Sequence, residues 1–137
     1  MKILIDTNII LDFLLARAPF FENAKKLMQL VDDNKTKAYI TANSITDIVY
    51  IVRKTYTIDE IRTAILALLD RIDVIGVDRE DILLAFGLGF SDFEDALQSA
   101  CSQKEQVECI VTRNKKDFEQ SNVTTVDISD FLAEYAV

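Results

Sequence analysis

The chain has 137 residues, 50% of them hydrophobic, and a single proline, which is enough for one hydrophobic core but not two, so we expect one domain over residues 1–137. The absence of histidine excludes Ser-His-Asp and Cys-His hydrolysis and HExxH zinc sites, and three glycines leave no glycine-rich phosphate loop. The formal charge of −8 argues against broad nucleic-acid binding, which needs a basic surface, but it permits a local site where acids hold a cation.

Apolar periodicity predicts short strands that alternate with helices. Lys2–Ile5 is an apolar run ended by Asp6, a pattern typical of a buried parallel strand. Capping-box spacing, a hydroxyl followed by an acid three residues later, marks helix starts at Thr57 and at Ser91. The expected strands are Lys2–Ile5, Ala38–Thr41, Asp73–Val77, Val107–Thr112 and, at an edge, Val123–Asp127. The expected helices run from Asn8 to near Pro19 and over Phe20–Val31, Ser44–Val52, Thr57–Arg71, Asp78–Gly89, Ser91–Glu105 and Ser129–Ala136.

Strands separated by helices pair in parallel through right-handed crossovers. We therefore expect an α/β fold, a three-layer α/β/α sandwich around a central, mostly parallel sheet of four or five strands. Sites in such sheets form at the carboxyl ends of the strands. No apolar run approaches the ~18 residues needed to span a bilayer, so we expect a cytoplasmic protein without membrane contact. We expect Cys101 and Cys109 to be reduced core residues.

Two acids closely follow expected strands. Asp6 ends the first strand, and Asp47 lies in the first turn of the helix after the second strand, where Ser44 or Asn43 is a candidate helix cap. Taken singly, Asp6 is a turn or cap residue, and Asp47 complements the helix dipole. Asn8 is either a cap or a hydrogen-bond partner of metal-bound water, and Asp12 is either a solvated helix residue or a support for the other acids.

The stretch FSDFEDALQSA carries three acids within four positions. With Ser91 as the cap, Asp92 and Asp95 fall one turn apart on one helix face, and Glu94 completes the capping box. The small residues that follow let this helix approach the sheet closely, where a carboxylate needs a cation or a hydrogen-bond donor. We therefore expect Asp95 to be functional and Glu94 to be mostly structural.

The last polar group, in VTRNKKDF, follows the fourth expected strand. Its oxygen-bearing residues are Thr112, Asn114 and Asp117, and its basic residues are Arg113, Lys115 and Lys116. Alone, this group is a turn and a solvated basic loop, but with the acids of the other segments it brings oxygen ligands to one sheet edge. Mg²⁺ and Mn²⁺ favour such carboxylates with retained waters. Such an ion activates water and neutralises charge on a phosphate, while the basic loop holds flanking phosphates.

Four segments, ILIDTNIILDFL, TANSITDIVYIVRK, FSDFEDALQSACS and CIVTRNKKDF, resemble the successive motifs of PIN domains, in the same order and over nearly the whole chain. The resemblance implies a PIN-like α/β/α sandwich and a Mg²⁺- or Mn²⁺-dependent endoribonuclease that cleaves single-stranded RNA. Many small stand-alone members are VapC-like toxins of bacterial toxin–antitoxin pairs, which implies an antitoxin protein as a partner.

Carried over by motif, Asp6 matches the first acidic position of the family and Asp95 the third, with Asp92 as an additional acid nearby. Asp47 stands at the second position, where glutamate is usual, and Asn114 stands where many relatives have aspartate. The motifs and the basic loop together imply catalytic residues Asp6, Asp47, Asp95, Asn114 and Asp117, metal ligands Asp6, Asp47, Asp92 and Asp95, and substrate or water contacts Asn8, Ser44, Thr112, Arg113, Lys115 and Lys116.

Other interpretations remain open. A PIN-like module that binds RNA or protein without cleaving it fits the Asp47 and Asn114 departures, and it predicts metal binding without cleavage. A phospho-receiver domain predicts an acidic pair after the first strand and a lysine after the last, which LIDTN and TTVDIS lack. A structural domain whose acids only cap helices predicts no specific response to divalent ions. Apolar residues on helices such as FFENAKKLMQL are more often used in core packing, and a homodimer interface is the alternative use.

Overall fold

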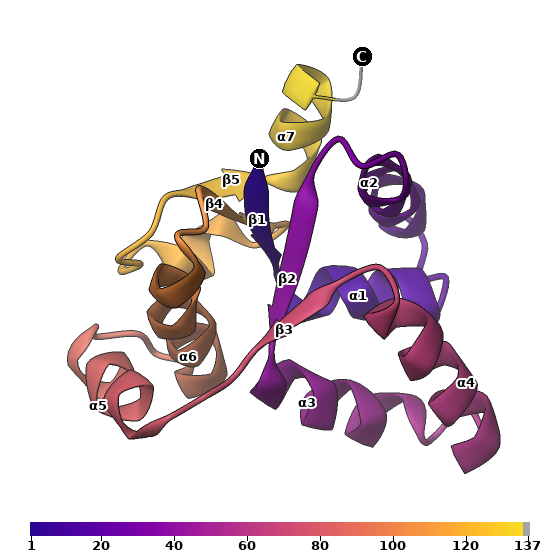
Figure 1. The fold of residues 1–137 in the computed structure, drawn as a ribbon, viewed down its shortest axis with the longest axis horizontal. Helices are drawn as coiled ribbons and strands as arrows, with labels where there is room; N and C mark the ends of the chain where they lie inside the picture. The colour runs from indigo at the N-terminus through magenta and orange to yellow at the C-terminus, as the bar shows by residue number, and fades with distance from the viewer. Residues whose placement is uncertain (136–137) are drawn as a thin grey trace.

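The computed structural model describes residues 1–135 and contains the five expected strands (Figure 1). The strands are β1 (Lys2–Ile5), β2 (Lys37–Thr41), β3 (Asp73–Ile75), β4 (Cys109–Thr112) and β5 (Thr125–Asp127). The helices are α1 (Thr7–Leu14), α2 (Phe21–Asp32), α3 (Ala42–Val52), α4 (Ile58–Leu69), α5 (Arg79–Gly87), α6 (Phe93–Ser102) and α7 (Ile128–Tyr135), with 3₁₀ turns η1 (Gln103–Glu105) and η2 (Lys115–Phe118). The expected end of the last helix, Ala136, lies outside the described residues.

The strands form one sheet in the order β3-β2-β1-β4-β5, and every neighbouring pair is parallel. This confirms the expected parallel sheet, with β5 at an edge. β1 is central, and its Leu4 aligns with Tyr39 of β2 and Ile110 of β4. Because all five strands run the same way, the segments that follow β1, β2 and β4 emerge together at the carboxyl ends of the strands, here called the carboxyl edge of the sheet.

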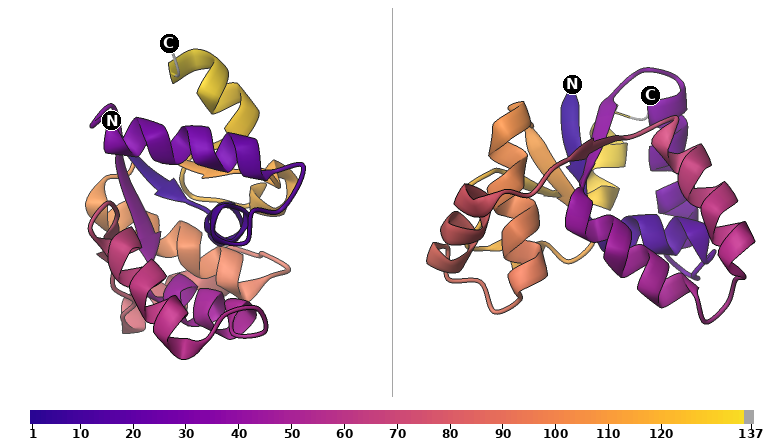
Figure 2. Two further views of the ribbon diagram at one scale, coloured as in Figure 1. Left: turned by 90° about the vertical axis from the view of Figure 1, so that its right-hand side faces the viewer. Right: turned by 60° about the horizontal axis from the view of Figure 1, so that its bottom comes forward.

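Alternation along β1 directs its side chains to two separate layers. Ile3 and Ile5 are fully buried in the larger core, which α1, α2 and α7 cover. Leu4 faces the other side, where it packs with Cys101 of α6 and Phe118 of η2. Figures 1 and 2 show α5 and α6 together on one side of the sheet and α1, α2 and α4 on the other. The three-layer α/β/α architecture is therefore confirmed.

The start of α4 is as expected. The Thr57 hydroxyl accepts the Glu60 N–H at 3.2 Å, and the Glu60 carboxylate accepts the Thr57 N–H at 2.9 Å, which completes the capping box. The start of α3 differs, because the helix already begins at Ala42, and Thr41 occupies the N-cap position. The expectation that Asn43 or Ser44 caps this helix is wrong.

The start of α6 also differs from the expectation. The Asp92 carboxylate accepts the Asp95 N–H at 3.0 Å, so Asp92 is the cap, and the predicted cap at Ser91 is wrong. The sequence SDFED contains two overlapping caps with the same spacing, and the structure uses the second. With Asp92 as the cap, Phe93 is the first helical residue and stacks on Phe86 of α5, with ring centroids 4.3 Å apart.

Cys101 and Cys109 are free and buried, as expected. Burial raises the pKa of Cys101 to about 12 and that of Cys109 to about 11, so both are thiols at neutral pH. None of the helices within residues 1–135 has the length and apolar character that crossing a bilayer requires.

Candidate functional site

Asp6 lies immediately after β1, at the centre of the carboxyl edge of the sheet. Its backbone N–H extends the β1–β4 ladder by donating to Val111, and its carbonyl accepts the Ile9 N–H at the start of α1, both at 3.0 Å. The buried carboxylate accepts a hydrogen bond from the Thr112 hydroxyl at 2.8 Å. Burial raises the pKa of Asp6, and the hydrogen bonds from Thr112 and Gln98 oppose that rise.

Gln98 of α6 connects Asp6 to Asp95. Its Nε2 donates to Oδ1 of Asp6 at 3.2 Å and to Oδ1 of Asp95 at 3.3 Å, and its Oε1 accepts the Thr7 N–H at 3.2 Å. Gln98 is 1% exposed. Because the Thr7 N–H at the start of α1 fixes the amide oxygen, the amide nitrogen is directed at both carboxylates. One buried side chain therefore joins the acids that follow β1 to those that begin α6.

Asp95 lies among like charges. Burial, followed by the charges of Asp6, Asp92 and Asp117, raises the pKa of Asp95 to about 7. Asp92, which caps α6, is exposed. These acids come from three separate segments of the chain, and their mutual repulsion is only partly relieved by hydrogen bonds. A bound cation would relieve it.

Asp47 of α3 is in contact with Glu94 of α6. Burial, together with the hydrogen bond and charge of Asp47, raises the pKa of Glu94 to about 7. The buried Oδ2 of Asp47 has no hydrogen-bond partner among the described residues. Two carboxyl groups in contact must share a proton or a cation. Because Asp92 caps α6, Glu94 is the second helical residue, and the expectation that it completes a capping box with Ser91 is wrong.

A chain of hydroxyl groups joins the segments that follow β1 and β2. The Thr7 and Ser44 hydroxyl oxygens lie 2.6 Å apart, and those of Ser44 and Thr41 lie 3.0 Å apart. Ser44 is fully buried. Its hydroxyl therefore fixes the start of α3 against the start of α1, which supports the positions of Asp6 and Asp47.

The segment after β4 folds back over Asp6. The Thr112 hydroxyl, besides donating to Asp6, accepts the Asn114 N–H at 3.0 Å, and the Asn114 carbonyl accepts the Asp117 N–H at 2.9 Å. Asp117 is exposed, and its charge reaches Asp95. Lys115 and Lys116 are exposed on η2, beside this edge of the sheet.

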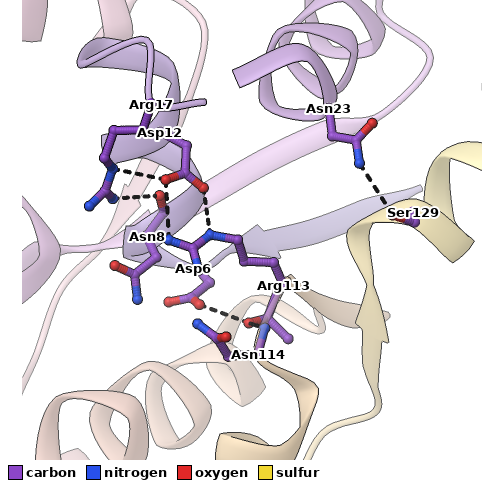
Figure 3. Close-up of polar contacts among 9 residues, drawn as sticks. Asp6, Asn8, Asp12, Arg17, Asn23, Arg113, Asn114 and Ser129 are labelled. Atoms are coloured by element: carbon purple, nitrogen blue, oxygen red, sulfur yellow. Dashed lines mark hydrogen bonds and ion pairs between the residues drawn. The ribbon is translucent and has the colours of Figure 1, made fainter. Parts of the chain in front are cut away.

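Asp12 is not the solvated helix residue that the sequence left open, because it is buried in an ion-pair cluster (Figure 3). Arg113 donates through Nε to Oδ2 at 2.7 Å and through Nη2 to Oδ1 at 3.3 Å, and Arg17 Nε lies 2.9 Å from Oδ1. Arg17 also donates to the Asn8 carbonyl at 3.3 Å. The Arg113 charge opposes the rise in the pKa of Asp6. Arg113 is therefore a fixed cation rather than a mobile residue of the basic loop.

The donor set fits a hard divalent cation. Its atoms are carboxylate, amide and hydroxyl oxygens, which Mg²⁺ and Mn²⁺ prefer. The raised pKa of Asp95 and the orphaned Oδ2 of Asp47 mark negative charge that the described residues leave uncompensated. Within residues 1–135, no three acidic or cysteine side chains gather closely enough to enclose an ion. The arrangement therefore fits an ion that is held by one or two carboxylates and keeps several waters.

Sequence reasoning missed three residues of this edge: Gln98, Glu94 as a partner of Asp47, and Arg17. Gln98 follows Asp95 by three positions, a spacing that places both on one helix face, and this signal could have identified it. Its contact with Asp6 crosses 92 positions and is not visible in any local pattern.

Comparison with protein families shows the family to which the chain belongs. A family model described as the PIN domain matches residues 2–116, so the chain belongs to the PIN domain family. The match includes Asp6, Asp47, Asp95 and Asn114 and ends just before Asp117. No curated protein sequence matches the chain.

Solved structures share the fold at low sequence identity. VapBC2 from Rickettsia felis, bound to a promoter DNA fragment, is 17% identical with a TM-score of 0.69, covering 93% of this chain and 98% of its own. A toxin–antitoxin complex from Klebsiella pneumoniae is 23% identical with a TM-score of 0.68, covering 91% and 96%. VapC20 from Mycobacterium tuberculosis, described as a sarcin-ricin loop cleaving toxin, is 15% identical with a TM-score of 0.63, covering 79% and 86%.

Proposed function

We propose that this protein is a metal-dependent endoribonuclease that cleaves single-stranded RNA, and that residues 1–137 act as one PIN-like domain. The observation that carries the proposal is the joining of Asp6 and Asp95 by the buried Gln98 amide, at a place where burial and neighbouring negative charges raise the pKa of Asp95 to about 7. Membership of the PIN domain family supports it, as does the fold shared with a toxin described as cleaving the sarcin-ricin loop.

When bound, Mg²⁺ or Mn²⁺ supplies an activated water and neutralises charge that develops on a phosphate. We assign the ion to Asp6 and Asp95, the two carboxylates that Gln98 joins, and we assign Asp47 and Asp92 to contacts with the waters that the ion retains. Histidine is absent, so the carboxyl groups and ordered water handle protons. The other candidates for orienting water or the substrate are Asn8, Thr112, Asn114 and Asp117, with Ser44 supporting the site, and the candidates for flanking phosphates are Lys115, Lys116 and Arg113.

An antitoxin protein is the proposed partner, and the toxin–antitoxin complexes among the similar structures support this assignment. A groove of about 530 Å³ between α1, α3 and α4 offers an apolar lining that includes Leu14, Val52, Tyr56, Ile61 and Ile65. Such a groove suits an amphipathic segment of a partner. A homodimer remains the other proposed assembly. Sedimentation of the purified chain, alone and with a candidate antitoxin, distinguishes these two associations.

The test of the proposed activity is cleavage of end-labelled single-stranded RNA by the purified wild-type protein in Mn²⁺, in Mg²⁺ and in EDTA. We expect cleavage with either ion, none in EDTA, and a loss of at least about a hundredfold in Asp6→Asn and Asp95→Asn. Glu119→Gln, which changes an exposed acid directly after η2 that has no assigned role, is the matched control and should retain activity. Metal binding without cleavage by the wild type would favour the non-cleaving PIN-like module instead.

A further inference from the structure

An aromatic side chain lies beside the ion-pair cluster of Asp12. The guanidinium carbon of Arg113 is 3.8 Å from the ring centroid of Phe20, in the loop between α1 and α2. Phe20 is nevertheless 40% exposed. Because Asp12 holds the Arg113 guanidinium through two nitrogens, the stacked pair has a fixed orientation. Phe20 and Arg113 together form a rigid surface with an accessible aromatic ring.

The cluster carries surplus positive charge. Asp12 is the single carboxylate between Arg17 and Arg113, so the three side chains sum to +1 in a chain whose net charge is −8. A guanidinium has five N–H donors, and the bonds to Asp12 and to the Asn8 carbonyl use only some of them. The Arg17 side chain is 35% exposed and that of Arg113 is 20% exposed. Solvent-facing donors therefore remain for an anion.

This surface is next to the acids of the candidate site. Arg113 directly follows Thr112, whose hydroxyl donates to Asp6. Figure 3 shows the Arg113 guanidinium between the carboxyl groups of Asp12 and Asp6. Asp12 lies six residues after Asp6 in the chain, so the two are about 9 Å apart along α1 at 1.5 Å per residue. A nucleotide next to a phosphate bound at Asp6 would reach Phe20 and Arg17.

We infer that Phe20 and Arg17 form a binding site for one unpaired nucleotide that flanks the scissile phosphate, with the base stacked on Phe20 and the phosphate bound by Arg17. Arg113 is a positioning residue that holds the ring. Aromatic stacking with a nearby guanidinium is how proteins bind single strands without reading their sequence. The inference rests on the proposed function and deepens it by locating the strand. It accounts for the partly exposed ring of Phe20 beside a buried ion pair. An ion pair that only fixed α1 to η2 would not need such a ring.

The test is binding of a short labelled single-stranded RNA by fluorescence anisotropy in Ca²⁺, with Asp95 left in place in every protein. Ca²⁺ takes oxygen ligands but activates water less strongly than Mg²⁺, so the strand stays intact. Phe20→Leu should weaken binding about tenfold, and Phe20→Tyr should restore it. Arg17→Gln should weaken binding about threefold and reduce the slope of log affinity against log salt by about 0.7. Thermal unfolding of each variant checks that the fold is retained.

The matched control is Tyr135→Leu. Tyr135 is also 40% exposed, but it lies near Glu108 and Cys109, at the opposite end of β4. Equal affinity of the control and the Phe20 and Arg17 variants would overturn the inference and leave the proposed function standing. Failure of the wild-type protein itself to bind RNA in Ca²⁺ would contradict both.

Discussion

Replacing Asp95 with asparagine should stabilise the metal-free protein at alkaline pH. The pKa of Asp95 rises from its ordinary value of 3.8 to about 7 on folding, because of burial and the charges of Asp6, Asp92 and Asp117. Between these two pH values the folded protein keeps a proton that the unfolded chain has lost, so stability falls as the pH rises through this window. At 1.36 kcal/mol per pKa unit the penalty at pH 8 is about 4 kcal/mol, and solvent screening of a partly buried group reduces it to about 2 kcal/mol.

Asparagine carries no charge and keeps the Oδ1 that accepts from Gln98, so it removes the penalty without removing that bond. Urea unfolding followed by circular dichroism, in EDTA at pH 8 and near pH 4, measures the effect. We expect Asp95→Asn to be about 2 kcal/mol more stable than the wild type at pH 8 and equal to it near pH 4. A variant that is no more stable at pH 8, or that gains as much near pH 4, would refute the repulsion argument.

Three further substitutions test individual side chains by urea unfolding. Gln98→Leu removes one buried and two partly buried hydrogen bonds, two of the three to acids, and should cost about 3 kcal/mol in EDTA. A loss below about 1 kcal/mol would mean that the amide does not join the site. Asp12→Asn leaves two arginines without their carboxylate and should lower the free energy of unfolding by about 3 kcal/mol. This loss should be largely independent of salt concentration, and a strong salt dependence would instead indicate a solvated pair. Thr57→Ala removes the α4 cap and should cost about 1 kcal/mol, and no change would show that the capping box contributes nothing.

The fold was largely predictable because local patterns determine it. The apolar run of Lys2–Ile5, ended by an acid, and the later runs separated by helices leave few arrangements besides a parallel sheet. The Thr57–Glu60 capping box was predicted correctly because no rival cap is adjacent to it. The start of α6 was not, since Ser91 and Asp92 each have an acid three residues later, and sequence spacing cannot rank two equivalent caps.

The candidate site was predictable in its positions but not in its contacts. Asp6 and Thr112 could be placed at one sheet edge because parallel strands align their carboxyl ends, and the structure joins them by a hydrogen bond. The bond between Gln98 and Asp6 and the pair formed by Arg113 and Asp12 cross most of the chain, so only the assembled fold reveals them.

The central claim is that the acids at this edge bind a divalent cation, and calorimetric titration of Mn²⁺ into the wild type and into Asp95→Asn, in buffer free of chelators, tests it most directly. The expected stability of the variant makes it a clean comparison, because loss of binding cannot then be attributed to unfolding. We predict saturable binding by the wild type that Asp95→Asn loses or weakens by at least about tenfold. Absence of binding to the wild type, or equal binding to both proteins, would contradict the assignment of Asp95 as a ligand.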